Sequence, residues 1–386
     1  MPSTAPSPHH ARLATMLLFF VCGAAFATWG IHIPTIQQRF GLSEAMLSVA
    51  MFAVAGGAIL AMPMVGRWVA RAGSHRASHY SGLLVGAMLA LILLAPSFTM
   101  LLPLLLLFGA SNAGLDVAMN AQAVTVEKQL GRPIMSALHG MFSLGGMAGA
   151  AAGGLLLAAG VTPLQHCLGM GVLTALSAML ASRVLLHDHH PAGEDAAAPS
   201  HLNRANRLIW ALGGLAFLGL IAEGGMYDWS VIYLRDTVHA SNAWSSVAYA
   251  AFSGGMALGR FGGDKLRARH GSVPLLRYSA ALAFAGMLLA LLWPVSAIIG
   301  FALTGLGAAN LIPVLFAASA HIPGTAPAEG IAGVARLAYI GLLLGPVMIG
   351  ALAHASNLQT ALGLIALCTA LIGLLAHRAL SAIPSA

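Results

Sequence analysis

The sequence predicts an all-α membrane protein built from twelve transmembrane helices, and three observations carry this prediction. Of its 386 residues, 59% are hydrophobic and only 8% are charged, whereas about a quarter of the residues in a soluble domain are charged. A helical span needs about 20 apolar residues, so the chain holds enough of them for about twelve spans. Its apolar runs are long, as in LLPLLLLFGA, and a membrane barrel would instead alternate over segments of about ten residues.

Each helix is placed by an apolar run that ends at a proline, a glycine or a charged cluster. In chain order the predicted spans cover 14–36, 45–66, 78–97, 100–124, 133–159, 164–186, 208–234, 243–263, 274–294, 297–320, 329–353 and 358–378. Residues 1–13 are Pro-rich and polar, without a small-residue cleavage signal before the first span. We therefore expect a retained tail at 1–13 and a second short tail at 379–386.

The basic residues predict the orientation, because Lys and Arg close to the spans stay on the cytoplasmic side. With a cytoplasmic N-terminus, 15 of the 18 Lys and Arg fall in the tails and in the cytoplasmic connections. Arg39 and Arg235 lie outside this set, and Arg336 lies within a span. The net charge of +7 is therefore a topology signal, and nucleic acid is not expected as a partner.

The chain reads as two six-helix halves, residues 14–186 and 208–378, joined by a polar linker at 187–207. Shifting the sequence by 196 residues superimposes six pairs of glycines, among them Gly145 on Gly341. Two halves in the same orientation form a parallel repeat, and transporters built this way bind solute between their halves.

No metal or cofactor site is predicted. The linker histidines lack the Cys or carboxylate company of a ligand set, so we interpret them as part of a solvated loop. The three cysteines, Cys22, Cys167 and Cys368, lie in or near separate apolar spans. We interpret them as small core residues rather than as a disulfide.

The segment GRWVARAGSHR, which starts at Gly66, resembles the cytoplasmic signature of the major facilitator superfamily, and the resemblance covers essentially the whole chain. The acidic position of that signature is Ala70 here, whereas the second-half copy GRFGGDKLRARHG keeps an acid. The resemblance implies twelve helices in two halves and a latch that closes one conformational state, acting mainly through the second half. The residues implied in this gating are Gly66, Arg67, Arg71, Arg260, Asp264 and Lys265.

The fifth predicted span contains GGMAGAAAGG, which is similar to a glycine motif of the same superfamily with Ala150 in place of its proline. The eleventh span contains GLLLGPVMIG, with Pro346 present. Glycines four residues apart let helices approach closely in lipid, so packing is their expected role. The complete motif is associated with antiporters, and because it is incomplete here the direction of transport stays open.

Two longer segments, FATWGIHIPTIQQRFGLS and GASNAGLDVAMNAQAVTVEKQLGRPIMSALHGMFSLGG, resemble a narrower bacterial inner-membrane branch of the superfamily. That branch includes the rhizopine-locus membrane protein and is distantly similar to fucose permeases. The resemblance implies a multi-pass protein of the bacterial inner membrane with both termini in the cytoplasm. It also implies a small polar or sugar-like solute, without identifying one.

Ionisable side chains inside the spans are the first functional candidates, because they are costly in hydrocarbon. Asp116 has Asn112 four residues before it and Asn120 four residues after it, so all three project from one helix face. His139 is predicted at a similar depth in the next span, and we expect it to assist Asp116 as the proton-coupling site. The alternatives are an interhelical hydrogen-bond clamp for the Asp116 face and a satisfied buried histidine for His139.

The seventh predicted span holds Glu223 near mid-membrane with Tyr227 on its face, and Asp228 points elsewhere. We expect Glu223 to take part in proton coupling and the other two to contact solute. On the 196-residue shift, Asp228 corresponds to His32 in the first span, where Trp29 also lies. Equivalent Gly- or Pro-broken helices are a pointer to a transporter's site, so both first-span residues join the solute set.

Three further solute candidates lie in the second half. Arg336 is the only Lys or Arg more than about one turn inside a predicted span, with Tyr339 one turn along. Glu223 or Asp116 is its expected partner; binding an anionic solute and snorkelling to the cytoplasm are the alternatives. Asn310, ahead of Pro313, is an amide near mid-membrane that either bonds solute or stabilises a kink.

The sequence thus predicts a monomeric secondary active transporter, proton-coupled, that moves a small polar solute through the bilayer. A proton-driven exporter of drugs or metabolites is the alternative, favoured by 18 Met residues. No nucleotide-binding loop, cofactor fingerprint or zinc motif is present, and no catalytic residue is proposed. An enzyme would need a converging nucleophile and base, and a sensor would need an output domain.

Overall fold

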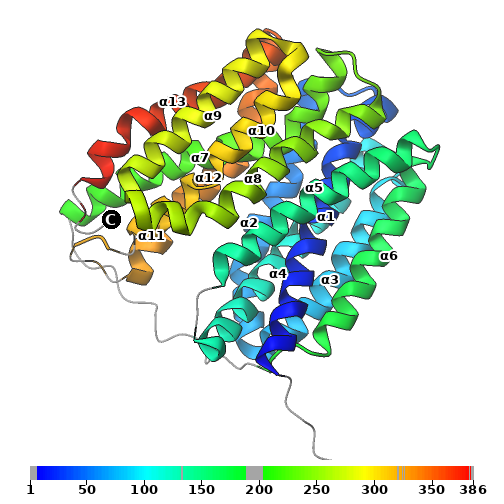
Figure 1. Cartoon of the computed structure of the whole chain (residues 1–386). Coiled ribbons are helices and arrows are strands. Elements are labelled where there is room, and N and C mark those ends of the chain that lie inside the picture. The colour runs from blue at the N-terminus through cyan, green and yellow to red at the C-terminus, as the bar shows by residue number, and fades with distance from the viewer. Residues whose placement is uncertain are drawn as a thin grey trace, which may run out of the picture. The chain divides into compact units, whose positions relative to one another are not determined.

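The computed structural model describes residues 7–131, 134–187, 203–319, 321–323, 325, 327–381 and 383, which contain helices and no strand (Figure 1). The helices of the first half are α1 (Pro8–Phe40), α2 (Glu44–Ala72), α3 (Ser74–Ile92), α4 (Phe98–Leu130), α5 (Met135–Ala158) and α6 (Pro163–Ser182). Those of the second half are α7 (Asn203–Asp236), α8 (Asn242–His270), α9 (Ser272–Leu292), η1 (Pro294–Ser296), α10 (Ala297–Ala308), α11 (Leu311–Ser319), α12 (Pro327–Ala355) and α13 (Leu358–Leu380). The prediction of an all-α membrane fold is confirmed.

Ten segments of the described chain are long and apolar enough to cross a membrane, and they match ten of the twelve predicted spans. The other two predicted spans, 78–97 and 243–263, correspond to α3 and α8, which are helical but more polar. The α3 helix begins SHRASHYS, and α8 is rich in Ser and Gly and carries its basic residues toward its end. These polar residues lower the mean hydropathy of α3 and α8, which explains why the two helices are not among the ten apolar segments.

The helix ends follow local capping chemistry. Ser7 caps α1 by accepting a hydrogen bond from the His10 amide, and α1 ends at Gly41, whose φ of 61° lies in the left-handed region. The predicted span 297–320 is not one continuous helix. It breaks between α10 and α11 at Ala309 and Asn310, and Pro313 occupies the first turn of α11, where a missing amide hydrogen costs little.

The chain divides into two compact units. Unit 1 comprises Met1–Leu42, Val49–Gly193 and Ser241–Ser246, and unit 2 comprises Ser43–Ser48, Glu194–Ala240 and Val247–Ala386. The main boundary falls inside the predicted linker 187–207, of which residues 188–202 lie outside the described residues. Each unit also contains a six-residue segment from the other half of the sequence.

Unit 1 is organised around α1, which packs against α4, α5 and α6. The α1–α5 contact is close because glycines of α5 face the α1 backbone: a Cβ at Gly145 would overlap the Phe20 carbonyl oxygen. At Gly149 the added Cβ would lie 2.8 Å from the Ala24 Cα. The expected packing role of the glycine motif is therefore visible within this unit.

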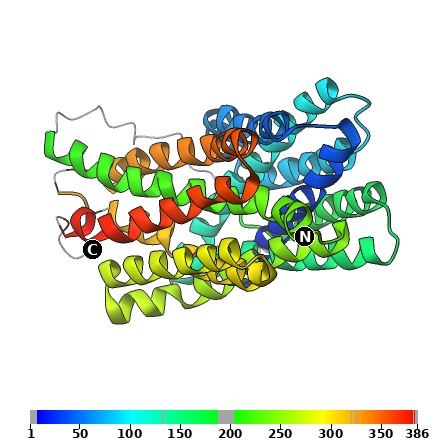
Figure 2. The same ribbon diagram turned by 90° about the horizontal axis from the view of Figure 1, so that it is seen from above.

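Unit 2 is organised around α7, which packs against α12 and α13, while α9 packs against α10 and α13. Figure 2 shows α7, α12 and α13 running alongside one another. A Cβ at Gly341 of α12 would overlap the Phe217 carbonyl oxygen, and one at Gly345 would lie 3.2 Å from the Ile221 Cα. The glycines superimposed by the 196-residue shift thus face the backbone of the first helix of their own unit, at positions one residue away from exact correspondence.

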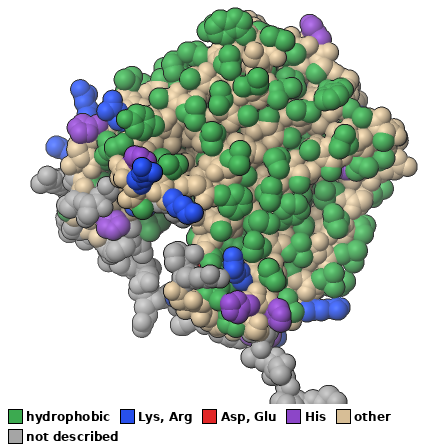
Figure 3. All heavy atoms as spheres, in the orientation of Figure 1, with side chains coloured by type: hydrophobic (Ala, Val, Ile, Leu, Met, Phe, Trp, Pro, Cys, Tyr) green, Lys and Arg blue, Asp and Glu red, His purple; other side chains and the backbone are tan. Residues whose placement is uncertain are grey.

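Large apolar side chains cover much of the visible surface, while Lys and Arg lie mostly on its left and lower sides (Figure 3). Leu60, Leu155 and Leu374 are each about 70% exposed, at 68%, 73% and 74%. An apolar surface of this kind suits contact with lipid. The three cysteines are buried and free, and the described residues contain no cluster of three metal-ligating side chains.

Candidate functional site

The polar face of α4 lies half-buried inside unit 1. The Asn120 side-chain amide donates to the Asp116 backbone carbonyl at 2.9 Å and to the Asp116 carboxylate at 3.2 Å. On the neighbouring α1, the Cys22 thiol donates to the Asn112 side-chain oxygen at 3.5 Å. Two of the three residues predicted on this face are therefore bonded to each other, and the third is bonded to α1.

His139 lies half-buried in the second turn of α5, where its ring packs edge-on against Phe19 of α1 with centroids 5.3 Å apart. Phe19 is one turn from Cys22, so the same stretch of α1 contacts both His139 and the α4 face. The hydrogen-bond partner of Asp116 in the described residues is Asn120, and the expected assistance from His139 stays a prediction.

Glu127 helps to fix this arrangement, and the sequence reasoning missed it. Its carboxylate accepts hydrogen bonds from the amides of Ile134 at 2.7 Å and Met135 at 3.2 Å, where α5 begins. A carboxylate there satisfies amides that lack a partner within the helix. Glu127 therefore positions the first turn of α5, one turn before His139.

The C-terminal part of α1 holds two of the predicted solute residues. Trp29 is 2% exposed and its ring is tilted against Phe108 of α4, with centroids 6.3 Å apart. His32 is 1% exposed and forms a hydrogen bond to His166 of α6. His166 was not predicted, because a single histidine near the start of an apolar span gives no signal until its partner is known.

In unit 2, Glu223 of α7 forms an ion pair with Arg260 of α8, with Oε1 and Nη2 3.0 Å apart. The sequence favoured Arg336 as a partner of Glu223 and assigned Arg260 to gating. Arg336 is instead exposed on α12 and forms no hydrogen bond or ion pair with the residues that the structure describes.

Tyr227 of α7 packs against an aromatic pair from α8, with ring centroids 5.0 Å from Tyr249 and 4.9 Å from Phe252. Asp228 is half-buried and makes no hydrogen bond or ion pair within the described ranges. Asn310, at the break between α10 and α11, is 6% exposed, and a Cβ at Gly263 would overlap its side-chain oxygen. Asn310 is thus held against α8.

The remaining predicted residues are spread along the chain. Tyr339 is half-buried on α12, and Lys265 is exposed on α8. Gly66, Arg67 and Arg71 are exposed near the end of α2, and a Cβ at Gly66 would meet nothing within 4 Å. The side chains of Ala70 and Asp264 lie outside the described residues, so the predicted latch has no described geometry at its acidic position.

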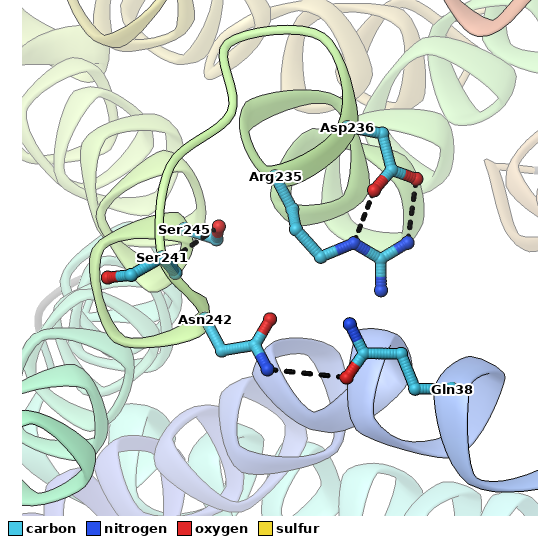
Figure 4. A network of polar contacts seen from close by, with 6 residues as sticks. All are labelled: Gln38, Arg235, Asp236, Ser241, Asn242 and Ser245. Carbon is cyan, nitrogen blue, oxygen red and sulfur yellow. Dashed lines mark hydrogen bonds and ion pairs between the residues drawn. The ribbon is translucent and has the colours of Figure 1, made fainter.

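Polar contacts also mark the connection between α7 and α8 (Figure 4). Within unit 2, Arg235 donates to the carboxylate of Asp236, through Nη2 at 2.6 Å. Within unit 1, the Asn242 amide donates to the Gln38 side-chain oxygen at 3.4 Å, and the Ser245 hydroxyl donates to the Ser241 carbonyl at 2.9 Å. The segment Ser241–Ser246 is therefore tied to α1.

Comparison with known proteins identifies the family. The profile of the Major Facilitator Superfamily matches residues 15–339. The chain is 34% identical over 358 residues to an uncharacterised MFS-type transporter of Yersinia pestis, covering 92% of each chain. It is also 34% identical to the membrane protein MosC of Rhizobium meliloti, covering 93% of this chain and 88% of that protein.

Solved structures show the same fold at low sequence identity. The nucleoside transporter NupG matches with a TM-score of 0.74 at 13% identity, covering 96% of this chain and 99% of that one. A bacterial homologue of the human lysosomal transporter Spinster, in an inward-facing and unoccupied conformation, matches with a TM-score of 0.73 at 15% identity. That match covers 99% of this chain and 98% of the other. With its helices, its apolar surface and these relatives taken together, the chain belongs to the major facilitator superfamily and is a multi-pass membrane protein of a family that transports solutes.

Proposed function

We propose that this protein is a proton-coupled secondary active transporter that moves a small polar solute, in the sugar-like size range, by alternating access. The observation that carries the proposal is the environment of Asp116. It lies within a membrane-spanning helix, its hydrogen-bond partner is the neutral amide of Asn120, and no described basic side chain forms an ion pair with it. Ionisable groups in such positions mark ion and proton pathways.

A neutral partner suits a carboxyl group that gains and loses a proton. An arginine in direct contact would hold the charged form, whereas an amide hydrogen-bonds to both the charged and the protonated form. Asp116 is therefore proposed as the group that carries the proton, with His139 assisting across the shared stretch of α1. Glu223 is proposed as a second acid, which must leave Arg260 before it takes a proton.

Solute recognition is proposed for side chains with amide, hydroxyl, carboxylate and aromatic groups in both units. A solute with several hydroxyl groups needs donors and acceptors of this mixture. The proposed set is Trp29, His32, Asn112, Asn120, Tyr227, Asp228, Asn310, Arg336 and Tyr339. Asp228 has its carboxylate free of protein partners among the described residues, so it is the first of the set to substitute.

We further propose a monomer in a bacterial inner membrane with both termini in the cytoplasm, and two functional halves at 14–186 and 208–378. The relatives that match most of the chain are bacterial, and the distribution of Lys and Arg supports this orientation. Gating is proposed for Gly66, Arg67, Arg71, Arg260, Asp264 and Lys265.

The test begins with solute-induced thermal stabilisation of the purified protein. Glucose, myo-inositol, glucosamine, citrate and tetraphenylphosphonium are screened at pH values on either side of neutrality, because a binder stabilises the folded state. A polar compound that stabilises the protein is then supplied as a radiolabelled solute to proteoliposomes with an inward proton gradient. Stabilisation confined to the apolar cation would contradict the polar-solute proposal and favour the exporter.

The coupling role is tested with Asp116→Asn in the same proteoliposomes. We expect gradient-driven accumulation to fall by about tenfold or more, while exchange of solute at equal pH persists, since the variant cannot carry the proton. Asp236→Asn is the matched control, because that acid lies at the exposed end of α7 beside Arg235. Full gradient-driven uptake in Asp116→Asn would refute the coupling role.

A further inference from the structure

A pair of histidines is enclosed within unit 1 between α1 and α6. His32 Nε2 and His166 Nδ1 are 2.9 Å apart, and the ring centroids are 5.1 Å apart at an interplanar angle of 61°. The two residues are 1% and 5% exposed. A third helix, α5, also packs against the pair, since a Cβ at Gly153 would lie 2.7 Å from His166 Cε1. Three helices therefore hold the rings at this distance.

The bond between the rings fixes how many protons the pair can hold. One facing nitrogen must carry a hydrogen and the other must offer a lone pair. Two neutral rings have four nitrogens and carry two protons between them, and one of these protons lies in the shared hydrogen bond. A third proton can bind to an outer nitrogen with the bond intact, whereas a fourth makes both facing nitrogens donors and breaks the bond. His32 Nδ1 is enclosed without a hydrogen-bond partner in the described chain.

Among the residues that the structure describes, no charged side chain forms a hydrogen bond or ion pair with His32 or His166. On α1 the next charged side chain is Arg39, whose guanidinium donates to the carbonyl oxygens of Leu93 and Ala95 at the end of α3. Arg39 thus contacts the chain just after the last residue of α3. The basic residues of α3 lie near its start, which is the opposite end of that helix from this contact. On α6 the adjacent titratable side chain is Cys167.

The remaining helices near the pair are α4 and α5, and their titratable side chains lie away from the two histidines along each helix. Asp116 of α4 lies beyond Phe108, the residue that meets Trp29. His139 lies near the start of α5, whereas Gly153, which meets His166, lies near its end. Within the described ranges, no carboxylate forms a hydrogen bond or ion pair with either imidazole. The doubly charged pair therefore has no counter-ion where it lies.

We propose that His32 and His166 form a proton-binding site that is separate from the Asp116 group and fastens α1 to α6. With one nitrogen of the shared bond unprotonated, the bond holds the two helices together. Full protonation breaks it and separates the C-terminal part of α1 from the first turn of α6. His166 lies three residues into α6, beside the Thr162 and Gln165 capping box, so the site is close to the end of a span. The inference goes beyond solute transport and requires no solute.

Cys167 provides the readout, because it follows His166 and is 1% exposed. Cys22→Ala and Cys368→Ala leave it as the only thiol in the chain. Its reaction with 4,4′-dithiodipyridine is followed at about pH 5.5 and about pH 7.5, on either side of the usual histidine pKa. Each rate is divided by that of a free thiol at the same pH, which removes the effect of thiol ionisation.

We expect the normalised rate to be about tenfold higher at the lower pH with both histidines present, because local opening exposes the buried thiol. In His32→Gln and in His166→Gln the ratio should fall to about twofold or less, since glutamine bonds to the partner ring and does not titrate. His354→Gln, which changes an exposed histidine on α12, is the matched control and should keep the full ratio.

An equal rise in both glutamine variants, or no rise in the parent protein, would overturn the proposal. Should a variant fail to give monodisperse protein, the parent labelled with ¹³C at histidine Cε1 decides the question. Two histidine resonances that titrate together in two steps support the pair, because coupled sites share their macroscopic transitions. Histidines that all titrate independently contradict it. Neither measurement uses a solute, so its failure is distinguishable from failure of the proposed transport function.

Discussion

Units 1 and 2 hold their membrane-embedded ionisable groups in different ways. In unit 1, Asp116 bonds to an amide and His32 bonds to a second imidazole. In unit 2, Glu223 is neutralised by Arg260, while Asp228 has no described partner. The two units also differ in packing. Glycines of α5 lie closer to the α1 backbone than the corresponding glycines of α12 lie to the α7 backbone.

The difference indicates where protons can move without breaking an ion pair. A group with only neutral partners changes charge at a cost set by its surroundings, whereas a paired acid must first lose its cation. Unit 1 is thus the better candidate for reversible protonation, and in unit 2 the ion pair must open before Glu223 takes a proton. Three sets of variants test the differences between the units.

The largest effect is expected from removing one side of the ion pair in unit 2. Arg260→Ala leaves Glu223 half-buried without its cation, and breaking such a pair costs about 3 kcal/mol. Denaturant-induced unfolding of the purified protein measures the loss. The double variant Arg260→Ala/Glu223→Gln should recover part of it, because no unpaired charge remains. A double variant as unstable as the single one would show that packing, not charge, is lost.

A smaller effect is expected from the glycines that differ between the units. In Gly149→Ala the new Cβ would lie 2.8 Å from the Ala24 Cα, whereas in Gly345→Ala it would lie 3.2 Å from the Ile221 Cα. Overpacking costs about 1–3 kcal/mol, so Gly149→Ala should lower the unfolding temperature more than Gly345→Ala. Equal losses in the two variants would mean that both helix pairs relax to the same extent.

The smallest change in stability is expected from Asp116→Asn. The variant keeps a side chain that bonds to Asn120 and removes no ion pair, so its unfolding free energy should lie within about 1 kcal/mol of the parent. The same unfolding assay checks this value. A loss as large as that of Arg260→Ala would mean that Asp116 has a charged partner, and the contrast between the units would fail.

The sequence was sufficient for the fold because hydropathy and glycine spacing are local signals. Ten spans appeared where apolar runs predicted them, and the glycines near Gly145 and Gly341 pack helices as expected. The break before Leu311 was only partly visible: Asn310 and Pro313 marked a kink, but a kinked helix and an interrupted one share that pattern.

The partners of the site residues were harder to predict, because they come from helices far apart in sequence. The choice of Arg260 rather than Arg336 for Glu223 depends on how α7 and α8 are rotated. Likewise, His166 is separated from His32 by 134 residues, and Glu127 reaches the start of α5 only once the chain after α4 has turned back. Composition and periodicity carry no information on such pairings.

The short segments exchanged between the units have a consequence for biogenesis. Ser48 leaves the ribosome long before Gly350, yet a Cβ at Gly350 would overlap the Ser48 hydroxyl within unit 2. Likewise, Gly154 packs against Ser246 within unit 1, and Ser246 is synthesised only after α7. Neither unit reaches its final packing from one contiguous stretch of nascent chain. Halves translated as separate polypeptides would each lack a segment that the other carries.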